Sequence, residues 1–158
     1  VRVLTNSLVA NDVAAVHGGY TRHRRRLLRG GVQLWELKPE SGAATASSFT
    51  GSSGASLHTK AFAVDGQSLF VGSYNIDPRS TWLNTEQGVL VEDPTLTGQL
   101  EQLFALQVSG QHAWQVRLDG LTMTWTDDRS TVRREPEASL SRRFQAWIAR
   151  VLRMDAQL

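Results

Sequence analysis

Three short apolar runs follow one another between residues 58 and 93, and this stretch constrains the fold more than any other part of the chain. The pair Asp65-Gly66 lies between the first two runs, which is a signal for a tight hairpin. Gly72 ends the run at residues 69–71 and permits a bulge or a close approach of two backbones. The stretch therefore predicts two or three short strands with polar residues at their ends.

Two of these polar residues, His58 and Lys60, have the chemistry of a phosphoryl-transfer site. They are one residue apart, so on a strand both side chains leave the same face. A neutral imidazole can attack phosphorus if an acceptor fixes its tautomer, and Glu86 is the candidate acceptor. The Lys60 ammonium suits the non-bridging oxygens of a phosphodiester. Ser73 and Asn75 add neutral donors on one face of the next strand.

Each residue also has an ordinary structural explanation, because a surface histidine, a lysine in a strand or an aspartate in a turn is common without catalysis. Their combination is more specific. His-x-Lys, four residues, Asp, six residues and Gly-Ser-x-Asn occur without a gap, and an acid follows at Glu86. This spacing resembles the signature of the phospholipase D superfamily, the HKD motif.

Within that superfamily, the chain resembles the C-terminal half of a bacterial cardiolipin synthase. The resemblance covers residues 1–110 well and the remainder loosely, and it is most specific in the motif. Outside the motif it extends over segments at residues 1–7, 52–56, 77–80 and 88–91.

The resemblance implies a role for each motif residue. His58 would form a covalent phosphohistidine with the phosphatidyl group, while Lys60 and Asn75 would hold the phosphate and Glu86 would orient His58. Asp65, which we group with the catalytic residues, tends to be a structural partner in such enzymes. The covalent intermediate retains the energy of the diester bond, so no metal and no cofactor are expected.

The sequence departs from the superfamily in one respect, since it has a single motif where such sites combine two. His17, His23 and His112 lack a lysine two residues further on. The second half must then come from an N-terminal domain of the same protein or from a homodimer mate. The chain begins inside an expected strand and without a methionine, which favours a fragment of a longer enzyme.

Composition narrows the class of protein further. The 158 residues suit one domain with a sizeable core, and 41% of them are hydrophobic. There is no cysteine, which excludes a disulfide, a thiolate nucleophile and a cysteine-based metal site. No apolar run approaches the roughly 20 residues of a membrane-spanning helix, so any membrane contact is expected to be peripheral. The resemblance implies that this contact is with the cytoplasmic side of the bacterial inner membrane.

Before the motif, the sequence predicts a strand, a helix, a second strand and a loop. The strand ends in Thr5 and Asn6, which are either substrate contacts or a loop cap. The helix begins at the cap Asp12 and ends at Gly30-Gly31. Residues 32–37 form the second strand, and residues 39–56 form a Gly/Ser-rich loop that is a plausible lid or substrate entrance.

Five arginines form a cationic face on the predicted first helix, and solvent or an anionic lipid surface is an equally good partner for it. These are Arg22, Arg24, Arg25, Arg26 and Arg29. Apart from Tyr20, base-stacking aromatic residues are missing beside them, which disfavours nucleic acid.

After the motif, a helix begins at Asp93-Pro94, and a hairpin follows with Asp119-Gly120 as its two-residue turn. This turn pairs Leu118 with Leu121, Val116 with Met123 and Trp114 with Trp125. A last helix starts at Glu135-Pro136-Glu137 and carries an apolar stripe from Leu140 to Leu152, flanked by arginines. Such a helix either packs against the protein or anchors it to a membrane surface.

Together these observations predict an α/β fold, with a mixed sheet of about six strands flanked by helices, as in half of a phospholipase D-like α-β-α sandwich. Residues 1–110 form the catalytic half with one HKD motif, and residues 111–158 extend the same domain as a hairpin and an amphipathic helix. The expected function is phosphatidyl transfer of the cardiolipin synthase type on a phospholipid substrate. The alternatives are a phospholipase D, an HKD-type nuclease, or a half-domain that is inactive without its partner motif.

Overall fold

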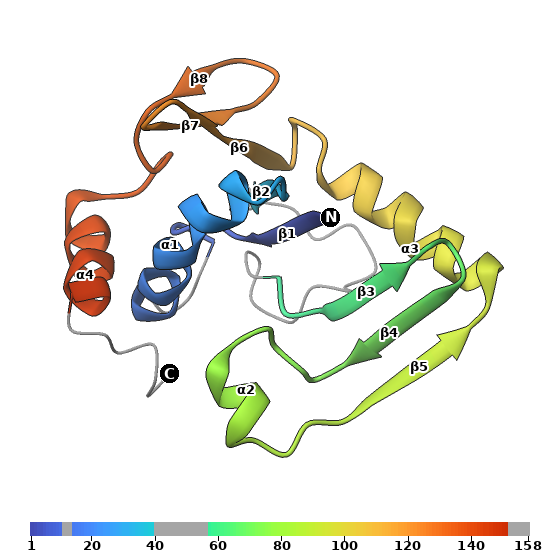
Figure 1. The fold of residues 1–158 in the computed structure, drawn as a ribbon. Helices are drawn as coiled ribbons and strands as arrows, with labels where there is room; N and C mark the ends of the chain where they lie inside the picture. The colour runs from blue at the N-terminus through green and yellow to red at the C-terminus, as the bar shows by residue number, and fades with distance from the viewer. Residues whose placement is uncertain (11–13, 40–56, 152–158) are drawn as a thin grey trace.

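The computed structural model describes residues 1–10, 14–39 and 57–151, and in these residues eight strands and four helices form a mixed α/β fold (Figure 1). The strands are β1 (Arg2–Asn6), β2 (Gln33–Leu37), β3 (Lys60–Val64), β4 (Ser68–Gly72), β5 (Gly88–Glu92), β6 (Ala113–Asp119), β7 (Thr122–Thr126) and β8 (Thr131–Val132). The helices are α1 (Ala14–Arg29), α2 (Pro78–Trp82), α3 (Pro94–Gln107) and α4 (Leu140–Val151). The predicted α/β class is therefore confirmed.

The larger sheet contains strands from both ends of the sequence, in the order β1-β2-β6-β7-β8. β1 and β2 are parallel, and the other pairs are antiparallel. Because β6 pairs directly with β2, the hairpin that follows residue 110 completes the sheet that the first forty residues begin.

The motif strands form a separate sheet, which corrects the expectation of one sheet with about six strands. β3, β4 and β5 pair antiparallel in that order, and β3 is an edge strand, as β1 is in the larger sheet. Helix α3 connects the two sheets: it packs on β3 and β4, and its Phe104 makes an edge-to-face contact with Trp35 of β2. Apolar patterning predicts strands but does not say which edges pair, so the division could not be foreseen.

The main core lies between α1 and the larger sheet. Leu34, Trp114, Val116 and Trp125 are buried there, and Tyr20 of α1 packs against them. Helix α1 runs through Gly18 and Gly19 and ends before Gly30-Gly31, as predicted, whereas its expected cap lies outside the described residues.

The predicted hairpin is present, but its register differs by one residue from the predicted one. Val116 pairs with Trp125 and Leu118 pairs with Met123, so the two loop residues are Gly120 and Leu121. Gly120 has a φ of 58°, and a glycine at the first loop position suits a type II′ turn. The shift leaves Leu121 exposed at the tip and lets the remaining apolar side chains face the core.

Two predictions need correction: the exposure of Arg24 on α1 and the first residue of the last helix. Arg24 is completely buried rather than part of the cationic face, because it forms ion pairs with Glu36 and Glu135. The helix α4 begins at Leu140 and not at Glu135, since Glu135 is held by Arg24 while Ala138 is buried against Leu8. The side chains beyond residue 151, part of the predicted stripe, lie outside the described residues.

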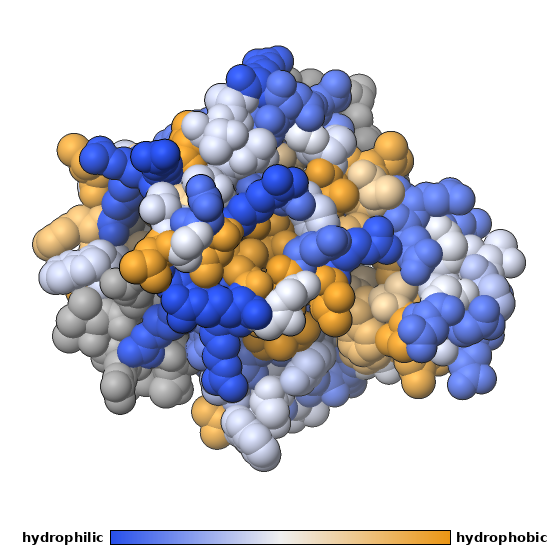
Figure 2. Space-filling view, turned by 45° about the horizontal axis from the view of Figure 1, so that its top comes forward, coloured by the Kyte–Doolittle hydropathy of each residue, from blue (hydrophilic) through white to orange (hydrophobic). Residues whose placement is uncertain are grey.

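Apolar side chains also reach the surface, where a space-filling view shows a hydrophobic area framed by hydrophilic side chains on one face (Figure 2). Among the described residues, no helix combines the length and the apolar character that crossing a bilayer requires.

Candidate functional site

The motif residues gather at one end of the small sheet. Lys60 begins β3 and pairs with Gly72 at the end of β4, which in turn pairs with Gly88 at the start of β5. Asp65 lies in the turn at the opposite end of β3, with a φ of 52°. Five residues of strand separate it from Lys60 by roughly 16 Å. The structure gives Asp65 the place of a turn residue, and its predicted place among the catalytic residues stays a prediction.

Gly72 is required at this end because two backbones approach closely. A Cβ atom on Gly72 would collide with the carbonyl oxygen of Gln87 and would stand 2.7 Å from the Cα atom of Gly88. The close approach lets the amide of Ser73 donate to the Gln87 carbonyl oxygen at 2.8 Å. The glycine thereby brings the residue after β4 against the segment before β5, which carries Glu86.

Glu86 is held by hydroxyl and amide donors. The hydroxyl of Ser73 donates to its Oε2 at 2.5 Å, and the Asn84 amide donates to its Oε1 at 3.3 Å. The bond from Ser73, with the nearby hydroxyl of buried Ser80, lowers the pKa of Glu86 below its ordinary value. The Ser73 hydroxyl thus contacts the Glu86 carboxylate in this structure, and its predicted role in phosphate binding stays a prediction.

Lys60 faces Glu86 and supports the chain at His58. Its Nζ atom donates to the backbone carbonyl oxygen of His58 at 2.7 Å. Partial burial lowers the pKa of Lys60, and the charge of Glu86 opposes this. His58 is exposed beside the pair, and the described residues contain no hydrogen bond between its imidazole and Glu86. Asn75 is exposed just after β4 and shares this end of the sheet.

Asn6 has a role that sequence reasoning missed, because its side chain holds the backbone next to His58. Its Nδ2 atom donates to the carbonyl oxygen of Leu57 at 3.0 Å, and its Oδ1 atom accepts from the Leu57 amide at 2.7 Å. The prediction placed Asn6 near the site as a substrate contact or a loop cap. Thr5, its neighbour, lies within β1 opposite Glu36.

A short helix that was not predicted, α2, closes the site on one side. Asp77 caps it by accepting from the Ser80 amide at 2.7 Å, and Pro78 occupies its first turn. Arg79 donates to the Asn84 side chain at 3.2 Å, which steadies the residue that contacts Glu86. The pair Asp77-Pro78 is the signal in the sequence that could have identified this helix.

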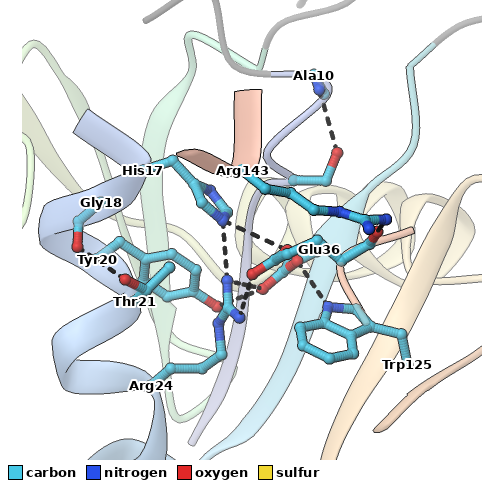
Figure 3. A network of polar contacts seen from close by, with 11 residues as sticks. Ala10, His17, Gly18, Tyr20, Thr21, Arg24, Glu36, Trp125 and Arg143 are labelled. Carbon is cyan, nitrogen blue, oxygen red and sulfur yellow. Dashed lines mark hydrogen bonds and ion pairs between the residues drawn. The ribbon is translucent and has the colours of Figure 1, made fainter. Parts of the chain in front are cut away.

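A second polar cluster is buried in the core of the larger sheet (Figure 3). The guanidinium of Arg24 contacts Glu36 at 3.0 Å and Glu135 at 2.7 Å, and its Nη2 atom lies 2.9 Å from Nε2 of His17. Trp125 also donates to Glu36, at 2.9 Å. Donor atoms of His17, Glu36 and Glu135 lie within 4.8 Å of one another, which would suit a metal ion. Arg24 already supplies the cation there, so the cluster is a structural ion pair.

The pKa values in this cluster reflect burial and pairing. Burial raises the pKa of Glu36, although the charge of Arg24 opposes the change. Burial also opposes the ionisation of Glu135, but contacts with His17 and Arg24 outweigh it and lower the pKa of Glu135 from 4.5 to about 2. The buried Arg24 therefore connects α1, β2 and the segment before α4 in one charged network.

A comparison with known protein families agrees with this fold and with the grouping of motif residues at one end of the small sheet. Residues 1–107 match the family described as cardiolipin synthase, PLD-like domain. This match covers more than half of the sequence, and the chain therefore belongs to the phospholipase D-like domain family of cardiolipin synthases, as the motif predicts.

Individual relatives agree with this assignment. The chain is 45% identical over 160 residues to cardiolipin synthase C of Escherichia coli K12, which covers 96% of this chain and 34% of the relative. It is 32% identical to an uncharacterized protein of Helicobacter pylori J99, over 79% of this chain and 24% of the relative. Cardiolipin synthase A of Proteus mirabilis is 50% identical over 44 residues, 28% of this chain and 9% of the relative. The chain thus spans about a third or less of these relatives, and no solved structure matches it.

Proposed function

We propose that this chain is the His58-bearing half of a phosphatidyltransferase of the cardiolipin synthase type. The observation that carries the proposal is the grouping of Lys60, Ser73 and Glu86 at one end of the small sheet beside an exposed His58. A cation for phosphate oxygens, an ionised carboxylate and an accessible imidazole are the groups that attack on a phosphodiester requires.

The reaction would proceed in two displacements. In the first, an imidazole nitrogen of His58 forms a bond to phosphorus while the bond from phosphorus to the headgroup oxygen breaks, and a proton neutralises the departing alcohol. In the second, a hydroxyl of another phospholipid attacks phosphorus, the bond to His58 breaks, and the hydroxyl proton leaves. Lys60 would stabilise the charge on the phosphate oxygens in both displacements, with Asn75 as a neutral donor.

The substrate class is supported by apolar side chains around this end of the sheet. Ile76, Trp82 and Leu83, which lie in α2 or next to it, are 88%, 81% and 74% exposed. Exposed apolar groups beside a phosphate site suit the acyl and glycerol parts of a phospholipid better than a nucleic acid backbone. The burial of Arg24 also removes one arginine from the surface that would attract nucleic acid.

A second half must complete the site under this proposal, because the chain has one motif and spans about a third of cardiolipin synthase C. The general acid for the departing alcohol would come from that half. We favour a preceding domain of the same protein over a second copy of this chain, and the partner would sit across the end of the small sheet where His58 is exposed.

The decisive experiment compares His58→Ala with His23→Ala in the complete protein that carries this chain. His23 is an exposed histidine on α1 and serves as the matched control. The proposal expects His58→Ala to abolish cardiolipin formation and the acid-labile phosphoenzyme formed from phosphate-labelled phospholipid, and His23→Ala to retain both. Cardiolipin formation that survives His58→Ala would refute it. Cleavage of DNA without any reaction on phospholipid would establish the nuclease alternative.

A further inference from the structure

The last helix, α4, presents a continuous apolar stripe to solvent. Leu140, Phe144 and Trp147 are 81%, 59% and 52% exposed. At about 100° per residue these three positions fall within roughly 60° of the helix circumference. The rings of Phe144 and Trp147 stack with their centroids 6.0 Å apart. Exposed apolar side chains that are contiguous in this way mark a contact surface.

A different face of α4 attaches the helix to the rest of the protein. Ala146 is buried against Leu8 and Ala138, and α4 packs alongside α1 (Figure 1). The buried cluster that holds α4 contains Ala146 and none of the three exposed residues of the stripe. Of the two alternatives predicted for this helix, packing against the described part of the chain does not account for these three exposed side chains.

A basic cavity lies next to the N-terminal end of the helix. It is an open depression of about 500 Å³, lined by Val132, Arg133, Arg134, Glu135, Pro136, Glu137 and Arg143. Arg143 donates to the Glu135 backbone oxygen at 2.7 Å, and its buried Nε atom has no partner in the described part of the chain. The carboxylate of Glu135 pairs with Arg24, which leaves three arginines against the one carboxylate of Glu137 in the lining of the cavity.

The combination points to one kind of partner. Arginine forks bind phosphate oxygens in pairs, while tryptophan and phenylalanine settle at the boundary between headgroups and acyl chains. A protein partner would match the stripe but would have no need of an arginine-lined cavity beside it. Charge and apolar character together therefore fit the surface of an anionic phospholipid bilayer.

We propose that α4 and the cavity lined by Arg133, Arg134 and Arg143 form the surface by which this protein docks onto an anionic bilayer. A lipid phosphate occupies the cavity, and Phe144 and Trp147 insert between neighbouring headgroups. The inference rests on the proposed function only in taking the phospholipid bilayer as the source of the substrate.

The test measures co-sedimentation of the complete protein with vesicles of phosphatidylcholine, with or without phosphatidylglycerol. Two double variants address the surface: Phe144→Ser with Trp147→Ser, and Arg133→Gln with Arg134→Gln. Their matched controls are Leu103→Ser with Leu106→Ser on α3, and Arg117→Gln in β6 with Arg129→Gln after β7, all of which replace exposed residues.

Replacing the aromatic pair is expected to lower binding to phosphatidylglycerol vesicles by roughly tenfold or more. Replacing the arginine pair is expected to lower it by about fivefold for each charge removed. The arginine effect should shrink as salt rises, because the charges are exposed. Binding equal to that of the control variants would overturn the proposal. So would a change of subunit composition in the α4 variants, measured by light scattering, because a protein partner would then cover the stripe.

Activity on detergent-dispersed phospholipid is measured in parallel and separates the two proposals. The docking surface is distant in sequence from the motif, so its variants should retain this activity. If the unaltered protein has no such activity yet binds vesicles through α4, the proposed function fails and the docking surface stands. If activity is present but the α4 variants bind vesicles as well as the unaltered protein does, the docking proposal alone fails.

Discussion

The bonds between Asn6 and Leu57 lead to the sharpest test of how His58 is positioned. We expect Asn6→Ala to impair the reaction through the backbone next to His58, which the Asn6 side chain holds at Leu57. The Asn6 side chain bonds to Leu57 as a neighbouring strand would, because it hydrogen-bonds to both the amide and the carbonyl group of that residue. Without it, the backbone that delivers His58 loses its connection to β1.

The magnitude follows from the two bonds, at 3.0 and 2.7 Å. Each contributes about 1 kcal/mol net, so removing both weakens the placement of Leu57 by about 2 kcal/mol. If that cost appears entirely as a smaller fraction of molecules with His58 in place, kcat falls about 30-fold. KM should change little, because Lys60 keeps its own position in β3.

The assay compares kcat, KM and thermal unfolding of the complete protein for three variants. Asn6→Asp keeps the acceptor for the Leu57 amide and should recover part of kcat. Ser7→Ala, the control, removes a contact with the Ala10 amide at the same strand end and should lower only the unfolding temperature. Should Asn6→Ala lower stability like Ser7→Ala while leaving kcat unchanged, the positioning argument is refuted.

Three further predictions concern the motif glycine, the carboxylate and the buried ion pair. Gly72→Ala should destabilise the protein by about 1–3 kcal/mol in urea denaturation, because a backbone cannot move aside as a flexible side chain would. Ser73→Ala should raise the pKa of Glu86 and move the acidic limb of the rate profile to higher pH; an unmoved limb would contradict the assigned bond. Because the pKa of Glu135 is lowered from 4.5 to about 2, its contribution of up to about 3 kcal/mol is present above pH 4.5 and should be lost as the pH falls toward 2. Glu135→Gln should remove this acid dependence from the unfolding curve.

Local features of the sequence predicted the small sheet well. The run of fixed spacings from His58 to Asn75 contains its own turn signal, and each strand pairs with its neighbour in the chain. In such a sheet the alternation of apolar and polar side chains along each strand, together with the turn residues, determines the register. Contacts with the rest of the protein add little to it. The same logic predicted the hairpin after residue 113 but placed its turn one residue early, because Asp119-Gly120 and Gly120-Leu121 are both plausible loops.

Long-range pairing of charges could not be predicted in this way. Arg24 lies in a run of arginines, and nothing local distinguishes it from its exposed neighbours Arg25 and Arg26. It is buried because Glu36, in β2, and Glu135, far along the chain, face the same point of α1. Burying a guanidinium is tolerable only with such partners, so the identity of the buried arginine depends on the assembled tertiary fold.

At the candidate site, Asn6 is a second residue whose long-range partner could not be predicted from the sequence, and this partner bears on function. The residue was singled out because strand ends meet ligands in open α/β sheets, and the reasoning gave the correct neighbourhood. Its partner, however, is the backbone of Leu57, 51 residues further on. A motif search finds the groups that are proposed to contact phosphate, but not the Asn6 amide that holds the backbone beside them. Supporting side chains of this kind are found only from hydrogen bonds between distant segments. The kcat of Asn6→Ala is therefore the more informative measurement of how the candidate site is built.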